Sequence, residues 1–156
     1  MEIKNIIVPI APLKSSCHHN SYQETQCLYG EEVEILNVNE NWSFCRTKID
    51  NYRGWIENKF LNNLPNFTHV ISTLSTFIYE KPDYKSKNLN TLFLNSKIKV
   101  LDMDETWAKI NFQEKKIGYI FVKHISSGFK KQNNWINLAK EFVSSPYSWG
   151  GKTCKG

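Results

Sequence analysis

Residues 30–42 read GEEVEILNVNENW, and residues 95–107 read NSKIKVLDMDETW. When the two stretches are aligned, every apolar position of the first falls on an apolar position of the second; Val33, for example, falls on Ile98. After a one-residue deletion the match resumes, with Gly-Trp-Ile at 54–56 on Gly-Tyr-Ile at 118–120. Self-similarity over such a distance indicates two copies of one structural unit.

Each copy consists of short β-branched or aromatic segments separated by clusters of Asn, Asp, Gly and Ser, which is typical of an all-β unit with tight turns. Five or so strands in about 60 residues are too few for a sandwich and favour a small SH3-like barrel. We therefore predict a mainly β chain, with one SH3-like barrel in residues 1–64 and a second in 67–127. The Asn-rich stretch 62–66 is the expected linker.

Residues 39–41 and 104–106 are predicted to be hairpin connections, each followed by a strand with inward-facing alternate residues. The expected inward residues are Ser43, Cys45 and Thr47 in the first copy and Ala108, Ile110 and Phe112 in the second. Because successive side chains of a strand point to opposite faces, Trp42 and Trp107 then lie on the outward face and should be at least partly exposed.

Residues 128–156 form a third region, in which the periodicity changes. A polar connector leads to Trp135, Leu138, Ala139 and Phe142, whose spacing predicts one face of a three-turn helix with Asn133 or Asn134 as its N-cap. A helix of this length cannot bury that face alone, so we expect it to lie against the barrels or against a domain outside this chain. Pro146 should end the helical pattern.

The amino-acid composition excludes few classes of protein. The formal charge of +5 comes almost entirely from Lys, which is typical of a solvated surface and makes nucleic-acid binding the less favoured interpretation. Of the four cysteines, Cys27 and Cys45 fall on the apolar positions Leu92 and Ile110 of the second copy, which indicates reduced core residues. The N-terminal stretch lacks the pattern of a signal peptide or a membrane span, so a cytoplasmic protein without membrane contact is expected.

Few residues carry a signal of chemistry. The Cys17-His18-His19 run with Cys27 lacks the spacing of a zinc site, so we expect no metal and no cofactor. Cys154 has no histidine nearby in the sequence and is interpreted as a spacer. Trp42 and Trp107, with Tyr52 and Tyr84 nearby in sequence, could line a ligand groove; alternatively, each Trp packs over its own hairpin.

The terminal run Pro146-Tyr147-Ser148-Trp149-Gly150-Gly151 resembles the opening of the catalytic domain in the NlpC/p60 family of cell-wall cysteine peptidases. Residues 5–63 look like the bacterial SH3-like domain that precedes this catalytic domain in dipeptidyl-peptidase-type members. The resemblance covers nearly the whole chain. It implies that residues 128–156 are a linker, a helix and the first loop of a truncated α+β, papain-like domain.

The resemblance also implies a γ-D-glutamyl-L-diamino acid endopeptidase that acts on murein stem peptides with a free N-terminal L-Ala, the barrels narrowing its cleft. By the family spacing, the nucleophilic Cys would lie three residues beyond Gly156 and the catalytic His later still. The chain as given is therefore expected to have no catalytic residue, to be inactive and to need the missing catalytic domain as its intramolecular partner. Tyr147, Trp149 and Gly150 are the expected substrate-binding residues. The alternative is a stand-alone module that binds stem peptides or other cell-wall fragments without catalysis.

Overall fold

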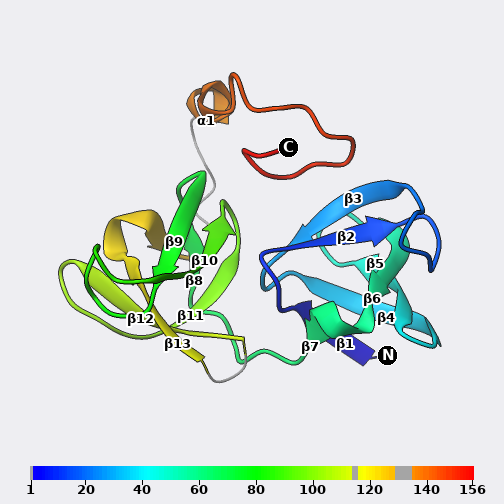
Figure 1. Cartoon of the computed structure of the whole chain (residues 1–156), viewed down its shortest axis with the longest axis horizontal. Coiled ribbons are helices and arrows are strands. Elements are labelled where there is room, and N and C mark those ends of the chain that lie inside the picture. The colour runs from blue at the N-terminus through cyan, green and yellow to red at the C-terminus, as the bar shows by residue number, and fades with distance from the viewer. Residues whose placement is uncertain (1, 114–115, 129–134) are drawn as a thin grey trace.

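The computed structural model describes residues 2–113, 116–128 and 135–156, and it shows one β-barrel for each copy of the repeat (Figure 1). The elements of the first barrel are β1 (Glu2–Ile6), β2 (Ile10–Lys14), β3 (Gln23–Leu28), β4 (Glu32–Asn39), β5 (Trp42–Thr47), β6 (Arg53–Glu57), the 3-10 turn η1 (Asn58–Phe60) and β7 (Leu61–Asn62). Those of the second are β8 (His69–Ile71), β9 (Ser75–Tyr79), β10 (Asn88–Phe93), β11 (Lys97–Met103), β12 (Trp107–Phe112), β13 (Lys116–Phe121), the 3-10 turn η2 (Val122–His124) and β14 (Ile125–Ser127).

The two sheets have the same strand order. The first runs β3-β2-β6-β5-β4-β1-β7 and the second β10-β9-β13-β12-β11-β8-β14, so each strand of one barrel has a counterpart at the same place in the other. The prediction of two tandem SH3-like units is confirmed. The count of about five strands per copy is too low, because short segments such as β7, with two residues, and β14, with three, also join the sheets.

The core of each barrel lies where strand alternation places it. Ser43, Cys45 and Thr47 are buried on β5, and Ala108, Ile110 and Phe112 are buried on β12, as predicted. Cys45 and Ile110 are fully buried at matching positions, and all four cysteines are free thiols. The hairpin between β4 and β5 has a positive φ at Glu40, and the one between β11 and β12 is capped by Asp104, whose carboxylate accepts the backbone N–H of Trp107 at 2.7 Å.

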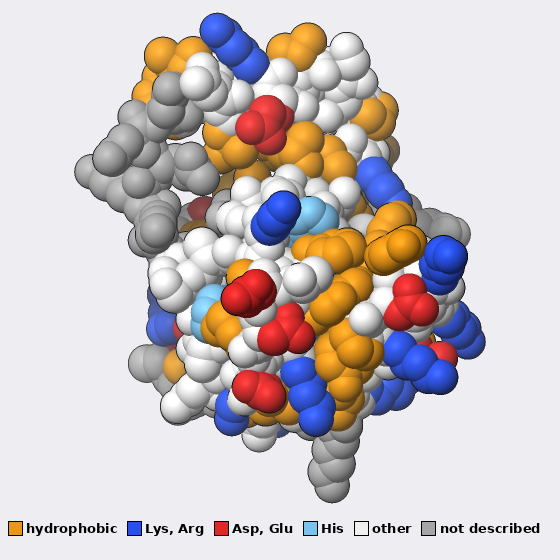
Figure 2. All heavy atoms as spheres, turned by 90° about the vertical axis from the view of Figure 1, so that its left-hand side faces the viewer, with side chains coloured by type: hydrophobic (Ala, Val, Ile, Leu, Met, Phe, Trp, Pro, Cys, Tyr) orange, Lys and Arg blue, Asp and Glu red, His pale blue; other side chains and the backbone are white. Residues whose placement is uncertain are grey.

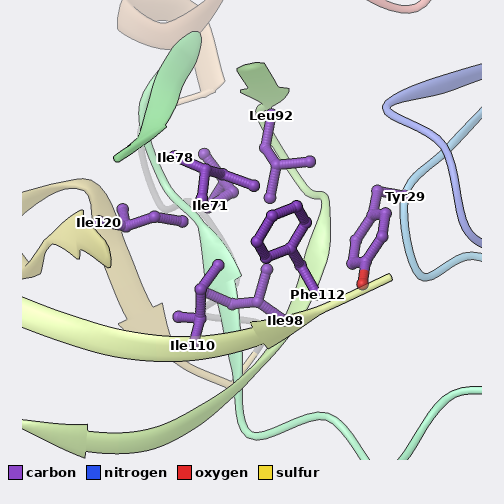
Figure 3. Close-up of a cluster of buried hydrophobic side chains, with 8 residues drawn as sticks. All are labelled: Tyr29, Ile71, Ile78, Leu92, Ile98, Ile110, Phe112 and Ile120. Carbon is purple, nitrogen blue, oxygen red and sulfur yellow. The ribbon is translucent and has the colours of Figure 1, made fainter. Parts of the chain in front are cut away.

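The two barrels are joined by Tyr29, which follows β3 of the first barrel but packs into the core of the second (Figure 3). Its ring is 3% exposed and lies against a cluster that includes Leu92, Ile98 and Phe112. Its hydroxyl oxygen accepts the backbone N–H of Gln113 at 3.1 Å, and its carbonyl accepts that of Lys97 at 2.9 Å. The barrels therefore share buried surface.

The only α-helix in the described part of the chain is α1 (Trp135–Glu141). With seven residues it is shorter than the predicted three turns, and the proposed N-caps at 133 and 134 lie outside the described residues. Most of its apolar face is not covered by the barrels, because Trp135 is 69% exposed and Ala139 is also exposed, so packing against a domain outside this chain stays the expectation for that face. Leu138 and Phe142 are only partly buried. Among the described residues, no helix has the length and apolar character needed to span a bilayer.

Candidate functional site

The C-terminal segment, residues 146–156, lies along β3, the strand at one end of the first sheet (Figure 1). The side-chain oxygen of Gln26 on β3 accepts the backbone N–H of Lys152 at 2.9 Å. Gly150 has a φ of +69°, and a Cβ there would come within 2.7 Å of the Glu24 carbonyl oxygen. The segment thus passes so close to β3 that only glycine fits, which gives Gly150 a positioning role.

This packing fixes the backbone beside the predicted substrate-binding aromatics but leaves their rings free. Gln23 donates from its side-chain amide to the Trp149 carbonyl oxygen at 2.8 Å. The side chains of Tyr147 and Trp149 remain 85% and 69% exposed. Both rings are therefore available to a ligand, and their substrate-binding role stays a prediction.

Lys152 ties the same segment to the first barrel by charge. Its ammonium donates to Asp50 at 2.9 Å and lies 3.9 Å from a carboxylate oxygen of Glu31. Burial by itself would lower the pKa of Lys152, but the hydrogen bond to Asp50 and the charges of both carboxylates outweigh it and hold the pKa above its ordinary value. Burial would likewise raise the pKa of Asp50, but hydrogen bonds from Thr47 and Lys152 hold it below the ordinary value. The ion pair is therefore intact at neutral pH.

Glu31 forms part of the wall of a pocket where the two barrels and the segment meet. The pocket has a volume of about 310 Å³ and is lined by Leu28, Glu31, Ile49, Asp50, Leu94, Asn95, Phe142 and Lys152. Glu31 is only 6% exposed, and its Oε2 atom, the oxygen that lies 3.9 Å from the Lys152 ammonium, has no partner at hydrogen-bond distance within the described structure. Burial raises the pKa of the Glu31 carboxyl, although the nearby Lys152 ammonium opposes the rise. A buried carboxylate oxygen without a donor is suited to accept a hydrogen bond from a ligand ammonium group.

The second candidate region is an aromatic cluster on the outer face of the second barrel. Trp107 stacks on Phe121, with ring centroids 4.2 Å apart, because the two residues are paired across β12 and β13. Tyr79 meets both rings edge-on at 5.3 and 5.8 Å, and Phe77 meets Tyr79 at 6.2 Å. Trp107 is partly exposed, as predicted, and it belongs to a larger aromatic surface.

The corresponding residue of the first barrel behaves differently. Trp42 is only 8% exposed, so the expectation of partial exposure is wrong there. The ring of His19, from the loop between β2 and β3, lies edge-on to Trp42 with centroids 5.3 Å apart. Tyr52 is placed at the opposite end of the β5–β6 hairpin, so it does not share a groove with Trp42. Tyr84 is 70% exposed in the turn that follows β9.

The two core thiols, Cys27 and Cys45, are poorly suited to nucleophilic chemistry. Burial raises the pKa of Cys45 to about 12 and raises that of Cys27 still further. The Cys154 thiol contacts the Leu74 carbonyl oxygen at 3.8 Å, and its spacer role stays a prediction. Among the described residues, no group of three or more His, Cys, Asp or Glu side chains could hold a metal ion.

Sequence reasoning missed two sets of residues. Glu31, Asp50 and Lys152 have no periodic relation in the sequence, so only the fold brings them together. For the aromatic cluster a signal was present, since the repeat aligns Lys14 with Tyr79 and Glu57 with Phe121, polar residues in one copy and aromatic residues in the other.

The duplicated seven-stranded barrels place this chain in the class of tandem SH3-like proteins. Residues 14–61 match the family described as "Bacterial dipeptidyl-peptidase Sh3 domain", and residues 73–126 match "Bacterial SH3 domain". The chain is 26% identical over 152 residues to dipeptidyl-peptidase 6 of Lysinibacillus sphaericus, a match that covers 84% of this chain and 56% of that protein. The chain thus spans about half the length of this curated relative.

The fold is similar to the crystal structure of an NlpC/P60 family protein from Bacillus cereus, with a TM-score of 0.81 and 16% identity. That match covers 99% of this chain and 68% of the other. Together with the sequence matches, it confirms two tandem bacterial SH3-like domains, in a chain that is similar in sequence to a dipeptidyl-peptidase and in fold to an NlpC/P60 family protein.

Proposed function

We propose that this chain is the substrate-restricting SH3 part of a γ-D-glutamyl-L-diamino acid endopeptidase that acts on murein stem peptides. The observation that carries the proposal is the buried Glu31 carboxylate, which has an unsatisfied oxygen at the pocket beside the docked C-terminal segment. The sequence match to a protein named dipeptidyl-peptidase 6 supports a peptide as the ligand.

The pocket fits the end of a peptide. Its volume of about 310 Å³ is at the lower end of the range for small-molecule sites, which suits one terminal residue. An N-terminal ammonium would give Glu31 Oε2 the donor it lacks, while Leu28 and Ile49 offer apolar contacts to a small side chain such as that of alanine. A peptide whose N-terminus is blocked would leave Glu31 Oε2 with no hydrogen-bond donor and only the more distant Lys152 ammonium, and this would disfavour it.

Two further features support a role as one wall of a cleft. Lys152 and Gly150 fix the C-terminal segment against β3, and Tyr147 and Trp149 extend exposed rings from that segment. These rings are the substrate-binding residues that the family resemblance implies, and they belong to the same segment as Lys152, which lines the Glu31 pocket.

The proposal is tested by titrating the chain with L-Ala-γ-D-Glu-diaminopimelate and with its N-acetylated form, using calorimetry. We expect saturable binding of the free peptide and binding at least about tenfold weaker for the acetylated one, equivalent to about 1.4 kcal/mol. Glu31→Gln should abolish this preference, while Glu32→Gln, an exposed neighbour, should preserve it. Equal affinity for both peptides, with both variants still folded by thermal melting, would contradict the proposal.

A further inference from the structure

Glu31 lines a second hollow, which lies at the junction of the two barrels and has a volume of about 330 Å³. This junction hollow is lined by Glu31, Glu32, Lys48, Ile49 and Lys97. Because Glu31 and Ile49 also line the pocket beside the C-terminal segment, the two cavities adjoin at the buried carboxylate. A ligand with its ammonium group at Glu31 can therefore extend into the junction hollow.

The two lysines of the junction hollow come from different barrels. Lys97 is the first residue of β11, and its backbone N–H donates to the Tyr29 carbonyl oxygen at 2.9 Å. Lys48 follows β5, and its backbone N–H donates to the Glu32 carbonyl oxygen at 3.0 Å. Lys97 is partly buried, whereas Lys48 and Glu32 are exposed. The fold thus brings two ammonium-bearing side chains to one hollow, and Lys97 is the less solvated of them.

The net charge of the junction hollow depends on what Glu31 binds. Its two lysines and two glutamates balance one another. An ammonium group bound at Glu31 cancels the buried negative charge, so that two cations then face only the exposed Glu32. Burial raises the pKa of the Glu31 carboxyl, and the charges of Lys152 and Lys97 oppose the rise, so Lys97 is close enough to act on this carboxylate. A ligand that brings an ammonium group therefore meets a net positive charge beside it.

The outer face of the second barrel shows the more ordinary setting of lysines. In Figure 2 lysines and carboxylates lie side by side on that face, open to solvent. Exposed charges of this kind attract a partner weakly, because water and salt screen them. Lys97 is partly buried and shares its hollow with a carboxylate that is 6% exposed, so screening is weaker there and a ligand carboxylate gains more.

We propose that Lys97 and Lys48 bind a carboxylate of the ligand that lies one residue beyond the ammonium group accepted by Glu31. This inference rests on the proposed function and names the part of the stem peptide that the junction hollow recognises. In L-Ala-γ-D-Glu the chain continues through the side-chain carboxyl of glutamate, so the α-carboxylate stays free. The ammonium and this carboxylate are attached to consecutive Cα atoms, about 3.8 Å apart, which suits two adjoining cavities.

The chemistry of the linkage makes the site selective. An α-linked peptide has no carboxylate at this place, because its α-carboxyl is used in the next peptide bond. A D-glutamate that is amidated at the α-carboxyl has no charge there. The junction hollow therefore selects γ-linked peptides whose second residue has a free α-carboxylate, and the two lysines that do so belong to both barrels.

The test compares L-Ala-γ-D-Glu-diaminopimelate with the same peptide amidated at the α-carboxyl of D-Glu, by calorimetry at low salt. Both peptides have a free N-terminus, and the N-acetylated acid is a third ligand that reports on Glu31. We expect the acid to bind about fivefold more tightly than the amide. Weaker binding on acetylation, with equal affinities for acid and amide, would overturn this inference and leave the proposed function standing. Equal affinities for all three peptides would overturn both.

Variants assign the effect to Lys97. Lys97→Gln should weaken binding of the acid several-fold and leave that of the amide unchanged, because it removes a charge that only the acid uses. Lys97→Arg should retain the preference for the acid, and Lys48→Gln should reduce it less, since Lys48 is exposed. Lys99→Gln is the matched control, because Lys99 lies on the same strand with similar burial and does not line the junction hollow. With all variants folded by thermal melting, equal effects of Lys97→Gln and Lys99→Gln would overturn the inference.

Discussion

The two barrels have matching strands, but they differ on the face that contains Trp42 and Trp107. The cross-strand neighbour of Trp42 is Glu57, whereas that of Trp107 is Phe121. In the first barrel His19 packs against Trp42, and its ring nitrogen lies 3.7 Å from the Glu57 carboxylate. Trp42 is thus buried and Trp107 partly exposed at equivalent places in two sheets of the same topology.

A second asymmetry concerns how the barrels depend on each other. The first barrel supplies Tyr29 to the core of the second, while the equivalent residue of the second barrel, Leu94, belongs to neither core cluster. Duplication of a barrel therefore did not produce two equal units. The second barrel needs a residue from the first in order to complete its core.

The sharpest way to break this dependence is Tyr29→Ala. Loss of a buried aromatic ring should lower the free energy of unfolding by about 3–5 kcal/mol, and the second barrel should bear most of the loss. Urea unfolding followed by NMR signals from both barrels should then show the second barrel unfolding at lower urea. In Tyr29→Phe only the partner of the Gln113 N–H is lost, and we expect about 1 kcal/mol.

Leu94→Ala is the matched control for Tyr29→Ala, and its effect should be smaller because Leu94 does not enter a core cluster of the other barrel. Coincident unfolding of both barrels in Tyr29→Ala, with a loss no larger than that of Leu94→Ala, would show that Tyr29 does not couple them in this way.

The next comparison exchanges the residues at one turn position. Gly30 and Asn95 are equivalent in the repeat and have φ values of +81° and +69°. A Cβ at Gly30 would come within 2.5 Å of the Lys97 carbonyl oxygen, because the second barrel packs there, whereas Asn95 is exposed. Gly30→Asn should therefore destabilise the chain by about 1–3 kcal/mol through overpacking at the junction.

The reciprocal change, Asn95→Gly, should alter stability by no more than about 0.5 kcal/mol, since it removes an exposed side chain at a φ that glycine adopts easily. Thermal melting of both variants measures the difference. Similar melting temperatures for the two variants would mean that the backbone at Gly30 and Lys97 adjusts to the added side chain without a measurable loss of stability.

The expected effects of the changes at Tyr29 and at Gly30 rest on a fold that the sequence largely predicts. Strand alternation around Cys45 and Ile110 is a local pattern, so the inward residues and the barrel class follow from apolar spacing alone. The burial of Trp42 does not follow, because its ring is contacted by His19, which lies in a different loop and has no periodic relation to it. For the same reason the sequence predicts an aromatic pair at 147 and 149 but not the group of Glu31, Asp50 and Lys152, whose members come from distant parts of the chain.

The comparison between Trp42 and Trp107 can be tested at its source with His19→Ala. Removing the ring should expose the edge of Trp42. The free energy of unfolding should fall by about 0.5–1.5 kcal/mol, the range for one aromatic pair. The lower end applies because His19 is itself largely exposed. Exchange of the Trp42 indole N–H with solvent should become faster, and that of the Trp107 indole N–H should not change.

His18→Ala is the matched control, since His18 precedes His19 in the same loop and forms no ring contact with Trp42 among the described residues. Equal indole exchange in the two variants would mean that the rest of the first barrel, rather than His19, keeps Trp42 buried. In that case the closed and open faces would differ through their strands alone, with Glu57 and Phe121 as the residues responsible.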